Sequence, residues 1–243
     1  MTKRRIIEFE GIYKSYGNKE ILKNLNLCID KGEFLTIIGS SGCGKTTLLK
    51  LVNGLIMPDK GRVLVYGEDI SKISKIELRR KIGYVIQEVG LFPHMNVRKN
   101  ISYVLDLINK DNKRSIQERT EYLIKSVGLS KEILNSYPGE LSGGQRQRIG
   151  IARALAAKPN IVLMDEPFGA VDEITRKLLQ EEILRIYNEF NVTIIFITHD
   201  IREALKLGTR VIVMDEGNII QSGTPTEIRE NPKTIFVKDL IGA

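Results

Sequence analysis

Short apolar runs separated by turn residues dominate the first part of the chain, a pattern that is typical of β-strands. The strands expected there are Ile6–Glu10, Ile21–Ile29, Phe34–Ile38, Arg62–Tyr66 and Ile82–Ile86. Two helices are expected among them, one over Thr47–Val52 and one around Ile76–Arg80. We therefore expect a strand-rich first part that two short helices interrupt.

The pattern becomes helical between residues 91 and 158. Val97–Asn109 and Ile116–Val127 carry apolar residues at helical spacing, and the charged loop Lys110–Ser115 separates them. A third helix is expected over Arg146–Ala157, because Pro159 cannot continue it. Residues 91–158 are therefore predicted to form an inserted, mainly helical subdomain.

Strands and helices alternate again in the last part of the chain. The expected elements are Asn160–Met164, Ile174–Phe190, Val192–Thr198, Ile201–Leu207, Arg210–Met214, Asn218–Gln221 and a short helical tail, Thr226–Ile241. Continuous apolar strands that alternate with helices favour a parallel sheet covered on both faces. The predicted fold class is α/β, with a mainly parallel central sheet.

Composition narrows the class of protein. The 243 residues are 42% hydrophobic and 28% charged, as in an ordinary globular chain. No apolar run approaches the ~18–20 residues that cross a bilayer, and the first residues lack the features of a signal peptide. The two cysteines, Cys28 and Cys43, provide no disulfide framework and no metal-ligand spacing. We expect a cytosolic protein.

The charge is basic, with 37 Lys and Arg against 30 Asp and Glu, a net +7. A basic surface favours nucleic acid, anionic lipid or nucleotide phosphates, although charge scattered without any single partner is an alternative. The absence of Trp and the 6% aromatic content leave few side chains on which bases could stack. No nucleic-acid partner is expected.

A glycine-rich segment follows the expected strand Phe34–Ile38 and opens a helix at Thr47. It reads Gly39-Ser40-Ser41-Gly42-Cys43-Gly44-Lys45-Thr46 and fits the phosphate-loop pattern G-x-x-x-x-G-K-[ST] without a mismatch. Glycines let backbone N–H groups surround a phosphate, and the helix N-terminus favours its negative charge. Lys45 is expected to reach the β- and γ-phosphates, and the Thr46 hydroxyl to bind Mg²⁺.

Two adjacent acids end the apolar strand Asn160–Met164. Ligands of open α/β sheets bind at the carboxyl ends of the strands, where Asp165 and Glu166 are expected. Neighbouring residues of a strand point to opposite sides, so we expect different roles for them. Asp165 suits the coordination shell of Mg²⁺, and Glu166 suits general-base catalysis on an attacking water. A simple cap after a strand is the structural alternative.

A second glycine motif precedes the helix Arg146–Ala157. Ser142, in Leu141-Ser142-Gly143-Gly144-Gln145, is a good N-cap, and the glycines leave the first N–H groups of the helix open to an anion. Placed between a phosphate loop and a carboxylate strand, this motif resembles the signature of the ATP-binding cassette (ABC) ATPases. The resemblance runs from about Ile6 to Gly242 with the motifs in the family's order.

The resemblance implies a fold. It is that of a P-loop NTPase in a single domain, 1–243, in which 1–90 and 159–243 form a RecA-like core. An N-terminal antiparallel β subdomain belongs to that core, and 91–158 form the helical subdomain that carries the signature.

The resemblance also implies roles for residues outside these motifs. Tyr16 matches the aromatic residue that stacks on adenine, and His199 matches the histidine at the γ-phosphate. Gln87 matches the glutamine that touches Mg²⁺ and the attacking water. Asp172 matches an acid at the dimer interface, although the chain has Gly169-Ala170-Val171-Asp172 where the family more often has Ser-Ala-Leu-Asp.

Two cassettes of this family pair head to tail. The resemblance thus implies a homodimer in which the segment Ser142–Gln145 of one subunit covers the ATP on the phosphate loop of the other. ATP and Mg²⁺ are the implied cofactors, and hydrolysis would open the dimer.

The partner is expected to be a membrane protein. Family members in DNA repair carry a long coiled coil or zinc cysteines, and those in translation carry two cassettes, whereas this chain has one cassette and two cysteines. We therefore expect a transport subunit at the cytoplasmic face of the cell membrane, bound to separate permease subunits and served indirectly by a solute-binding protein.

Four stretches are similar to the cassettes of glycine betaine, carnitine and choline importers: Glu77–Gln87, Gly90–Met95, Asp165–Asp172 and Glu203–Gly208. A quaternary amine is therefore the expected solute. The alternatives are an importer of another small solute, such as an amino acid or a polyamine, and a regulatory cassette ATPase without a transport role, for example in cell division.

Overall fold

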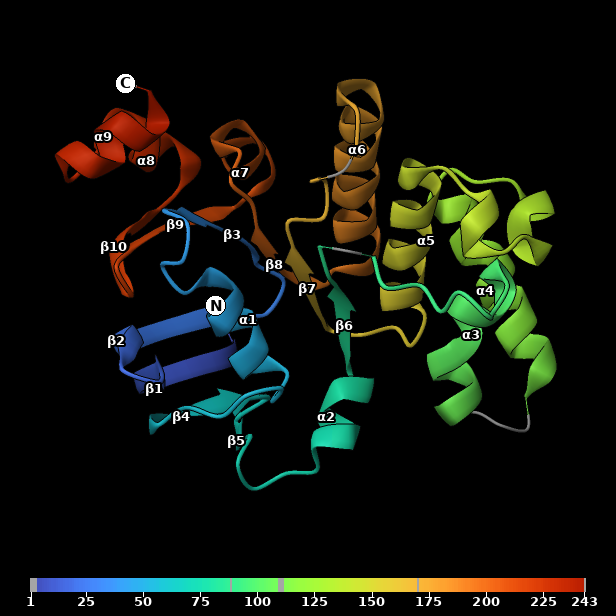
Figure 1. Cartoon of the computed structure of the whole chain (residues 1–243), viewed down its shortest axis with the longest axis horizontal. Helices are drawn as coiled ribbons and strands as arrows, with labels where there is room; N and C mark the ends of the chain where they lie inside the picture. Colours follow the sequence, from blue (N-terminus) through green and yellow to red (C-terminus); the bar gives the residue numbers. More distant parts are fainter. Residues whose placement is uncertain (1–3, 88, 109–111, 170, 243) are drawn as a thin grey trace. The chain divides into compact units, whose positions relative to one another are not determined.

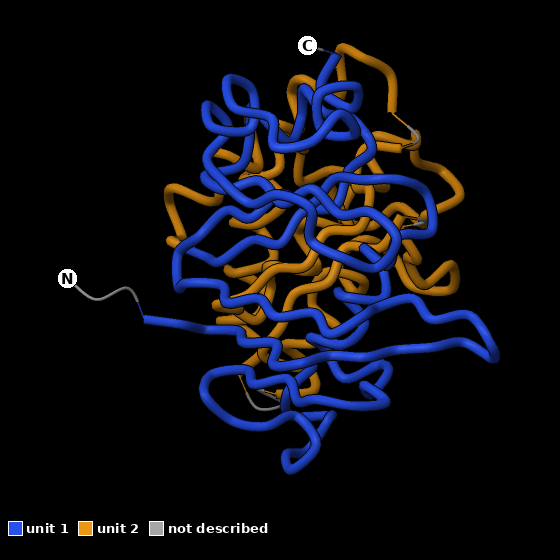
Figure 2. The backbone as a smooth tube through the Cα atoms, turned by 90° about the vertical axis from the view of Figure 1, so that its left-hand side faces the viewer, with its two compact units in different colours: residues 1–79, 192–243 blue, residues 80–191 orange. Residues whose placement is uncertain are grey.

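A computed structural model describes residues 4–87, 89–108, 112–169 and 171–242 of the chain. Asn109 and Lys110, at the expected helix–loop boundary, and Ala170 of the expected interface stretch lie outside the described residues. The chain divides into two compact units, Met1–Arg79 with Val192–Ala243 and Arg80–Asn191 (Figure 2). The predicted helical insertion, 91–158, falls within the second of them.

An antiparallel sheet forms the first part of unit 1. Its strands are β1 (Arg5–Tyr16), β2 (Lys19–Asp30), β4 (Lys60–Val65) and β5 (Glu68–Asp69), in the order β2-β1-β4-β5 (Figure 1). One face is apolar because alternate residues point to the same side, as the burial of Ile7 and Phe9 shows. The predicted N-terminal antiparallel subdomain is confirmed.

The second sheet of unit 1 is mainly parallel. Strand β3 (Phe34–Gly39) lies between β8 (Thr193–Ile197) and β9 (Arg210–Asp215) and runs parallel to both, while β10 (Asn218–Gly223) pairs antiparallel with β9. All of β8 and all but the last residue of β3 are buried. Burial on both faces explains why these strands are continuous apolar runs.

Helices of unit 1 are α1 (Lys45–Val52), α2 (Lys75–Arg80), α7 (Ile201–Leu207), α8 (Pro225–Glu230) and α9 (Ile235–Ile241). An apolar cluster joins strands β3 and β9 to the last three helices through Ile38, Val211, Ala204, Ile228 and Val237. The expectation of one helical tail over Thr226–Ile241 is wrong. Pro232 lies between α8 and α9, and Thr234 begins the second helix by accepting a hydrogen bond from the Val237 N–H.

Unit 2 contains the parallel pair β6 (Ile82–Val85) and β7 (Ile161–Asp165). Its helices are α3 (Val97–Ile108), α4 (Lys113–Ser126), α5 (Gly143–Leu155) and α6 (Glu173–Phe190), with 3₁₀ turns η1 (Lys131–Asn135) and η2 (Pro138–Glu140). Helix α4 begins inside the expected loop Lys110–Ser115, because Asn112 caps it by accepting from the Ser115 N–H.

The parallel pairs in both units and the antiparallel N-terminal sheet confirm the predicted α/β class. In the part of the chain that the structure describes, no helix has the length and apolar character that a membrane span requires.

Candidate functional site

The glycine-rich loop joins β3 to α1 in unit 1. The Lys45 amine donates to the carbonyl oxygens of Gly39 at 2.9 Å and of Ser40 at 2.8 Å, and it lies 3.7 Å from the Cys43 sulfur. The lysine therefore folds back over its own loop and places its positive charge there. The N-cap of α1 is Gly44, which has no side chain with which to cap the helix. A helix N-terminus beside a lysine amine suits a phosphate group.

The start of this loop tolerates no side chain. Gly39 has a φ of +147°, and a Cβ there would lie 1.9 Å from the Met214 carbonyl oxygen at the end of β9. The Ser40 hydroxyl also donates to the Asp215 carboxylate at 2.6 Å. The end of β9 therefore braces the phosphate loop. Sequence reasoning missed this role of Asp215, although an acid that ends an apolar strand is the signal by which Asp165 was found.

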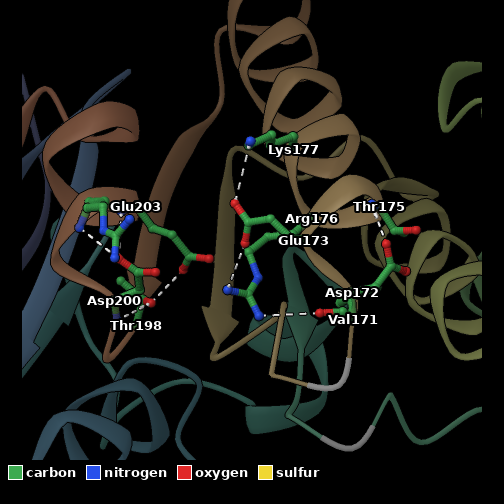
Figure 3. Close-up of polar contacts among 10 residues, drawn as sticks. Val171, Asp172, Glu173, Thr175, Arg176, Lys177, Thr198, Asp200 and Glu203 are labelled. Atoms are coloured by element: carbon green, nitrogen blue, oxygen red, sulfur yellow. Dashed lines mark hydrogen bonds and ion pairs between the residues drawn. The ribbon is translucent and has the colours of Figure 1, made fainter.

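His199 follows β8 in the same unit and is exposed. Side chains beside it fix its turn: the Thr198 hydroxyl accepts from the Asp200 N–H at 3.0 Å and donates to the buried Glu203 carboxylate at 2.6 Å (Figure 3). The turn is thus held by its neighbours, and the γ-phosphate role of His199 stays a prediction.

Tyr16 is the last residue of β1, and 48% of its surface is exposed. The Lys14 amine lies 5.9 Å from the centre of its ring. An exposed aromatic face is available for stacking, and the adenine-binding role of Tyr16 also stays a prediction.

The predicted carboxylates lie in unit 2, where Asp165 is the last residue of β7 and is buried. The expectation that strand alternation separates Asp165 from Glu166 is wrong. Glu166 lies beyond the strand in the left-handed region, with a φ of +44°, and its carbonyl oxygen accepts from the Gly169 N–H. A turn, rather than the pleat of the strand, therefore sets the direction of Glu166.

Gln87 follows β6 and lies beside Glu166. Its side-chain amide donates to the Glu166 carboxylate at 3.1 Å. The structure therefore brings together two of the three predicted catalytic residues, which are 79 positions apart in the sequence. His199 belongs to the other unit, as do the residues of the phosphate loop.

Tyr84, on β6, is a residue near Asp165 that sequence reasoning missed. Burial, together with the negative charge of Asp165, raises the pKa of Tyr84 to about 12. Tyr84 is thus partly buried, and the charge of Asp165 is close enough to act on its phenol.

The second glycine motif begins α5 with a capping box. The Ser142 hydroxyl accepts from the Gln145 N–H at 3.2 Å, and the Gln145 side chain accepts from the Ser142 N–H at 2.9 Å. The prediction of Ser142 as an N-cap is confirmed. A Cβ on Gly144 would lie 2.8 Å from the Thr175 side chain of α6, so the motif lies close to the start of that helix.

Asp172 caps α6. Its carboxylate accepts from the Thr175 N–H at 3.0 Å, which lowers the pKa of Asp172 below its ordinary value (Figure 3). Glu173, on the first turn of the helix, forms ion pairs with Arg176 and Lys177. The carboxylate of Asp172 is exposed, and its place at a dimer interface stays a prediction.

The residues predicted to bind Mg²⁺ are Thr46, Asp165 and Gln87. Hydroxyl, carboxylate and amide oxygens are hard donors, and Mg²⁺ usually takes only one or two carboxylates while phosphates and water complete its shell. Among the described residues no group of three or more His, Cys, Asp and Glu side chains could hold a metal ion. The chemistry of the predicted donors fits the ion.

Comparison with known proteins agrees with this geometry. The family model described as "ABC transporter" matches residues 22–169. The carnitine transport ATP-binding protein OpuCA of Listeria monocytogenes is 51% identical over 98% of this chain and 60% of its own length. The glycine betaine uptake system ATP-binding protein YehX of Escherichia coli is 44% identical over 98% of this chain and 77% of its own length.

A solved structure, the dimeric ABC transporter cassette MJ0796, is similar with a TM-score of 0.83 and 33% identity, over 90% of this chain and 99% of that one. The chain spans about 60% of the length of the first curated relatives that it matches. The family match covers more than half of the chain, and the loop, the carboxylate strand and the capped signature helix are all in place. This chain belongs to the ABC transporter family.

Proposed function

We propose that this chain is the ATP-hydrolysing subunit of an ABC importer for a quaternary amine such as glycine betaine, carnitine or choline. The observation that carries the hydrolytic part is the hydrogen bond between Gln87 and Glu166, because it holds a carboxylate in place at the end of a strand. The solute rests on the 44–51% identity to carnitine and glycine betaine transport ATP-binding proteins.

The phosphate loop would bind ATP. The Lys45 amine would replace its hydrogen bonds to the carbonyl oxygens of Gly39 and Ser40 by hydrogen bonds to phosphate oxygens. Its positive charge would then neutralise the negative charge of the phosphates. Loop residues Ser40 to Thr47 would donate N–H groups to the phosphates, and Tyr16 would stack on the adenine.

Metal binding would involve three side chains. Thr46, Asp165 and Gln87 would hold Mg²⁺, which supplies positive charge to the phosphate oxygens when it is bound. Glu166 would accept a proton from the attacking water, while Gln87 keeps its carboxylate oriented. His199 would donate a hydrogen bond to the γ-phosphate from its exposed turn.

A head-to-tail homodimer would complete each site. The segment Ser142–Gln145 of one subunit, at the N-terminus of α5, would cover the ATP on the phosphate loop of the other, and Asp172 would lie at the interface between them. The dimeric state of the MJ0796 cassette supports this assembly. The dimer would act at the cytoplasmic face of the membrane on separate permease subunits, with a solute-binding protein delivering the solute.

Uptake of labelled glycine betaine at high osmolarity, in cells that lack this chain, tests the proposal. Wild type should restore uptake, and Glu166→Gln should not, although it accumulates to the same level. Unlabelled carnitine and choline should compete with the label, whereas amino acids and polyamines should not. Restored uptake by Glu166→Gln would refute the proposed role of Glu166 in hydrolysis. Competition by a polyamine would indicate an importer of another small solute instead of a quaternary amine.

A further inference from the structure

An arginine on the signature helix holds the segment that follows Gln87. Arg153, on α5, donates from Nη2 to the Val89 carbonyl oxygen at 2.7 Å and from Nη1 to the Gly90 carbonyl oxygen at 2.8 Å. Its guanidinium carbon also lies 5.7 Å from the centre of the Phe92 ring. The planar fork of arginine suits two neighbouring carbonyls and an aromatic face, which a lysine could not satisfy together.

Gly150, one turn before Arg153 on α5, leaves space for the side chain of Val89. A Cβ at Gly150 would lie 2.6 Å from Cγ1 of Val89, so the valine side chain packs directly on the helix backbone. The contact is steric and involves no charge. It therefore brings the same segment to the same helix independently of the arginine.

Asn100, on α3, holds the far end of the segment. Its fully buried side chain accepts from the Phe92 N–H at 2.8 Å and donates to the carbonyl oxygens of Phe92 at 3.1 Å and Met95 at 2.9 Å. Buried polar groups that are satisfied in this way fix a loop in one conformation. The segment 89–95 is thus held by α5 at one end and by α3 at the other.

The clamp lies close to Gln87 in the chain. Val89 is two positions after Gln87, and two residues of chain span at most about 7 Å. We propose that Arg153 is a positioning residue that, by holding Val89 and Gly90 on the signature helix, sets the Gln87 amide against Glu166 and makes Gln87 and α5 move together. This inference deepens the proposed function and rests on it.

ATP turnover by the purified chain tests the inference with two variants. Arg153→Met removes the fork, and Gly150→Ala displaces Val89 while it favours the helix itself. Each should lower kcat about 10- to 100-fold, as expected for a misplaced catalytic group, and leave KM for ATP within about 2-fold. In a Gln87→Ala background neither variant should lower kcat further, because the residue that they position is already gone.

Arg119 provides the matched control. Its guanidinium donates to the carbonyl oxygens of Leu155 and Ala156 at the C-terminal end of α5, close to Arg153, and lies 5.3 Å from the Phe190 ring. None of these contacts involves residues 89–92. Arg119→Met should lower the melting temperature and leave kcat of the folded protein unchanged. An equal loss of kcat in Arg119→Met, or a full further loss from Arg153→Met in the Gln87→Ala background, would overturn the inference.

Hydrogen exchange separates this inference from the proposed function. The amides of residues 84–92 should exchange at least about 10-fold faster in Arg153→Met and Gly150→Ala than in wild type, and at the wild-type rate in Arg119→Met. Unchanged exchange in the first two variants would overturn the clamp. A wild-type chain that does not hydrolyse ATP would refute the proposed function, and the exchange rates would still decide whether the clamp exists.

Discussion

The side-chain amide of Gln87 donates a hydrogen bond to the Glu166 carboxylate over 3.1 Å. Glu166 is held for this contact in the left-handed region, with a φ of +44°, at a cost of about 1–3 kcal/mol for a residue that is not glycine. Its turn is closed by the Gly169 N–H and anchored by the buried side chain of Phe168. Backbone strain at a hydrogen-bonded carboxylate supports the hypothesis of a functional site.

Substitution of Gly39 should be much more damaging than substitution of Gly42 in the same loop. In Gly39→Ala the new Cβ would lie 1.9 Å from the Met214 carbonyl oxygen, so β9 must shift, and we expect a loss of about 2–4 kcal/mol in the free energy of unfolding. The new Cβ of Gly42→Ala would meet no atom of the described residues within 4 Å, so this variant should lose about 1–2 kcal/mol because of the φ of +75° alone. Urea unfolding of the two variants measures the difference. Equal losses would show that β9 does not brace the loop.

Tyr84 should ionise at a higher pH than an ordinary tyrosine side chain does. Its pKa is raised in the folded state to about 12, so the folded state keeps the proton more tightly than the unfolded state. Protonation of Tyr84 therefore adds to the free energy of unfolding. This contribution is fully present below pH ~10 and is lost as the pH rises towards ~12. Tyrosinate absorbance should therefore show a late transition that Tyr84→Phe removes.

The same titration tests the neighbour of Tyr84. Asp165→Asn removes the negative charge that helps to raise this pKa, so the late transition should move to lower pH. Glu166→Gln is the matched control, because within the described ranges Asp165 is the carboxylate that raises this pKa. A late transition that stays in place in Asp165→Asn would mean that burial alone sets the pKa.

Ser142 should have two separable roles, since it caps α5 and is proposed to bind ATP across the dimer. Ser142→Ala removes the cap and should lower the free energy of unfolding by about 1 kcal/mol. Ser142→Asp keeps a capping oxygen, so its stability should match wild type, but its negative charge should repel the phosphates and abolish ATP turnover. Wild-type turnover in Ser142→Asp would rule out the proposed contact with ATP.

Local patterns were enough to predict the strands except the two-residue β5, together with the phosphate loop and the capped signature helix, because each depends on residues that are close in the sequence. The hydrogen bond from Ser40 to Asp215 joins positions 175 apart, and the clamp of Arg153 on Val89 joins positions 64 apart. Such contacts depend on strand order and helix packing, which periodicity does not encode. The turn at Glu166 escaped prediction because strand alternation was carried one residue too far.

The most direct test of the account is ATP turnover by the purified wild-type chain and by Glu166→Gln, with ATP binding measured on the same samples. Glu166 is the residue proposed to take the proton from water, and general-base catalysis is typically worth about 10²–10⁴ in rate. We predict that Glu166→Gln binds ATP as wild type does, accumulates as a dimer and hydrolyses ATP at least about 100-fold more slowly. Hydrolysis by Glu166→Gln at the wild-type rate would contradict the central claim.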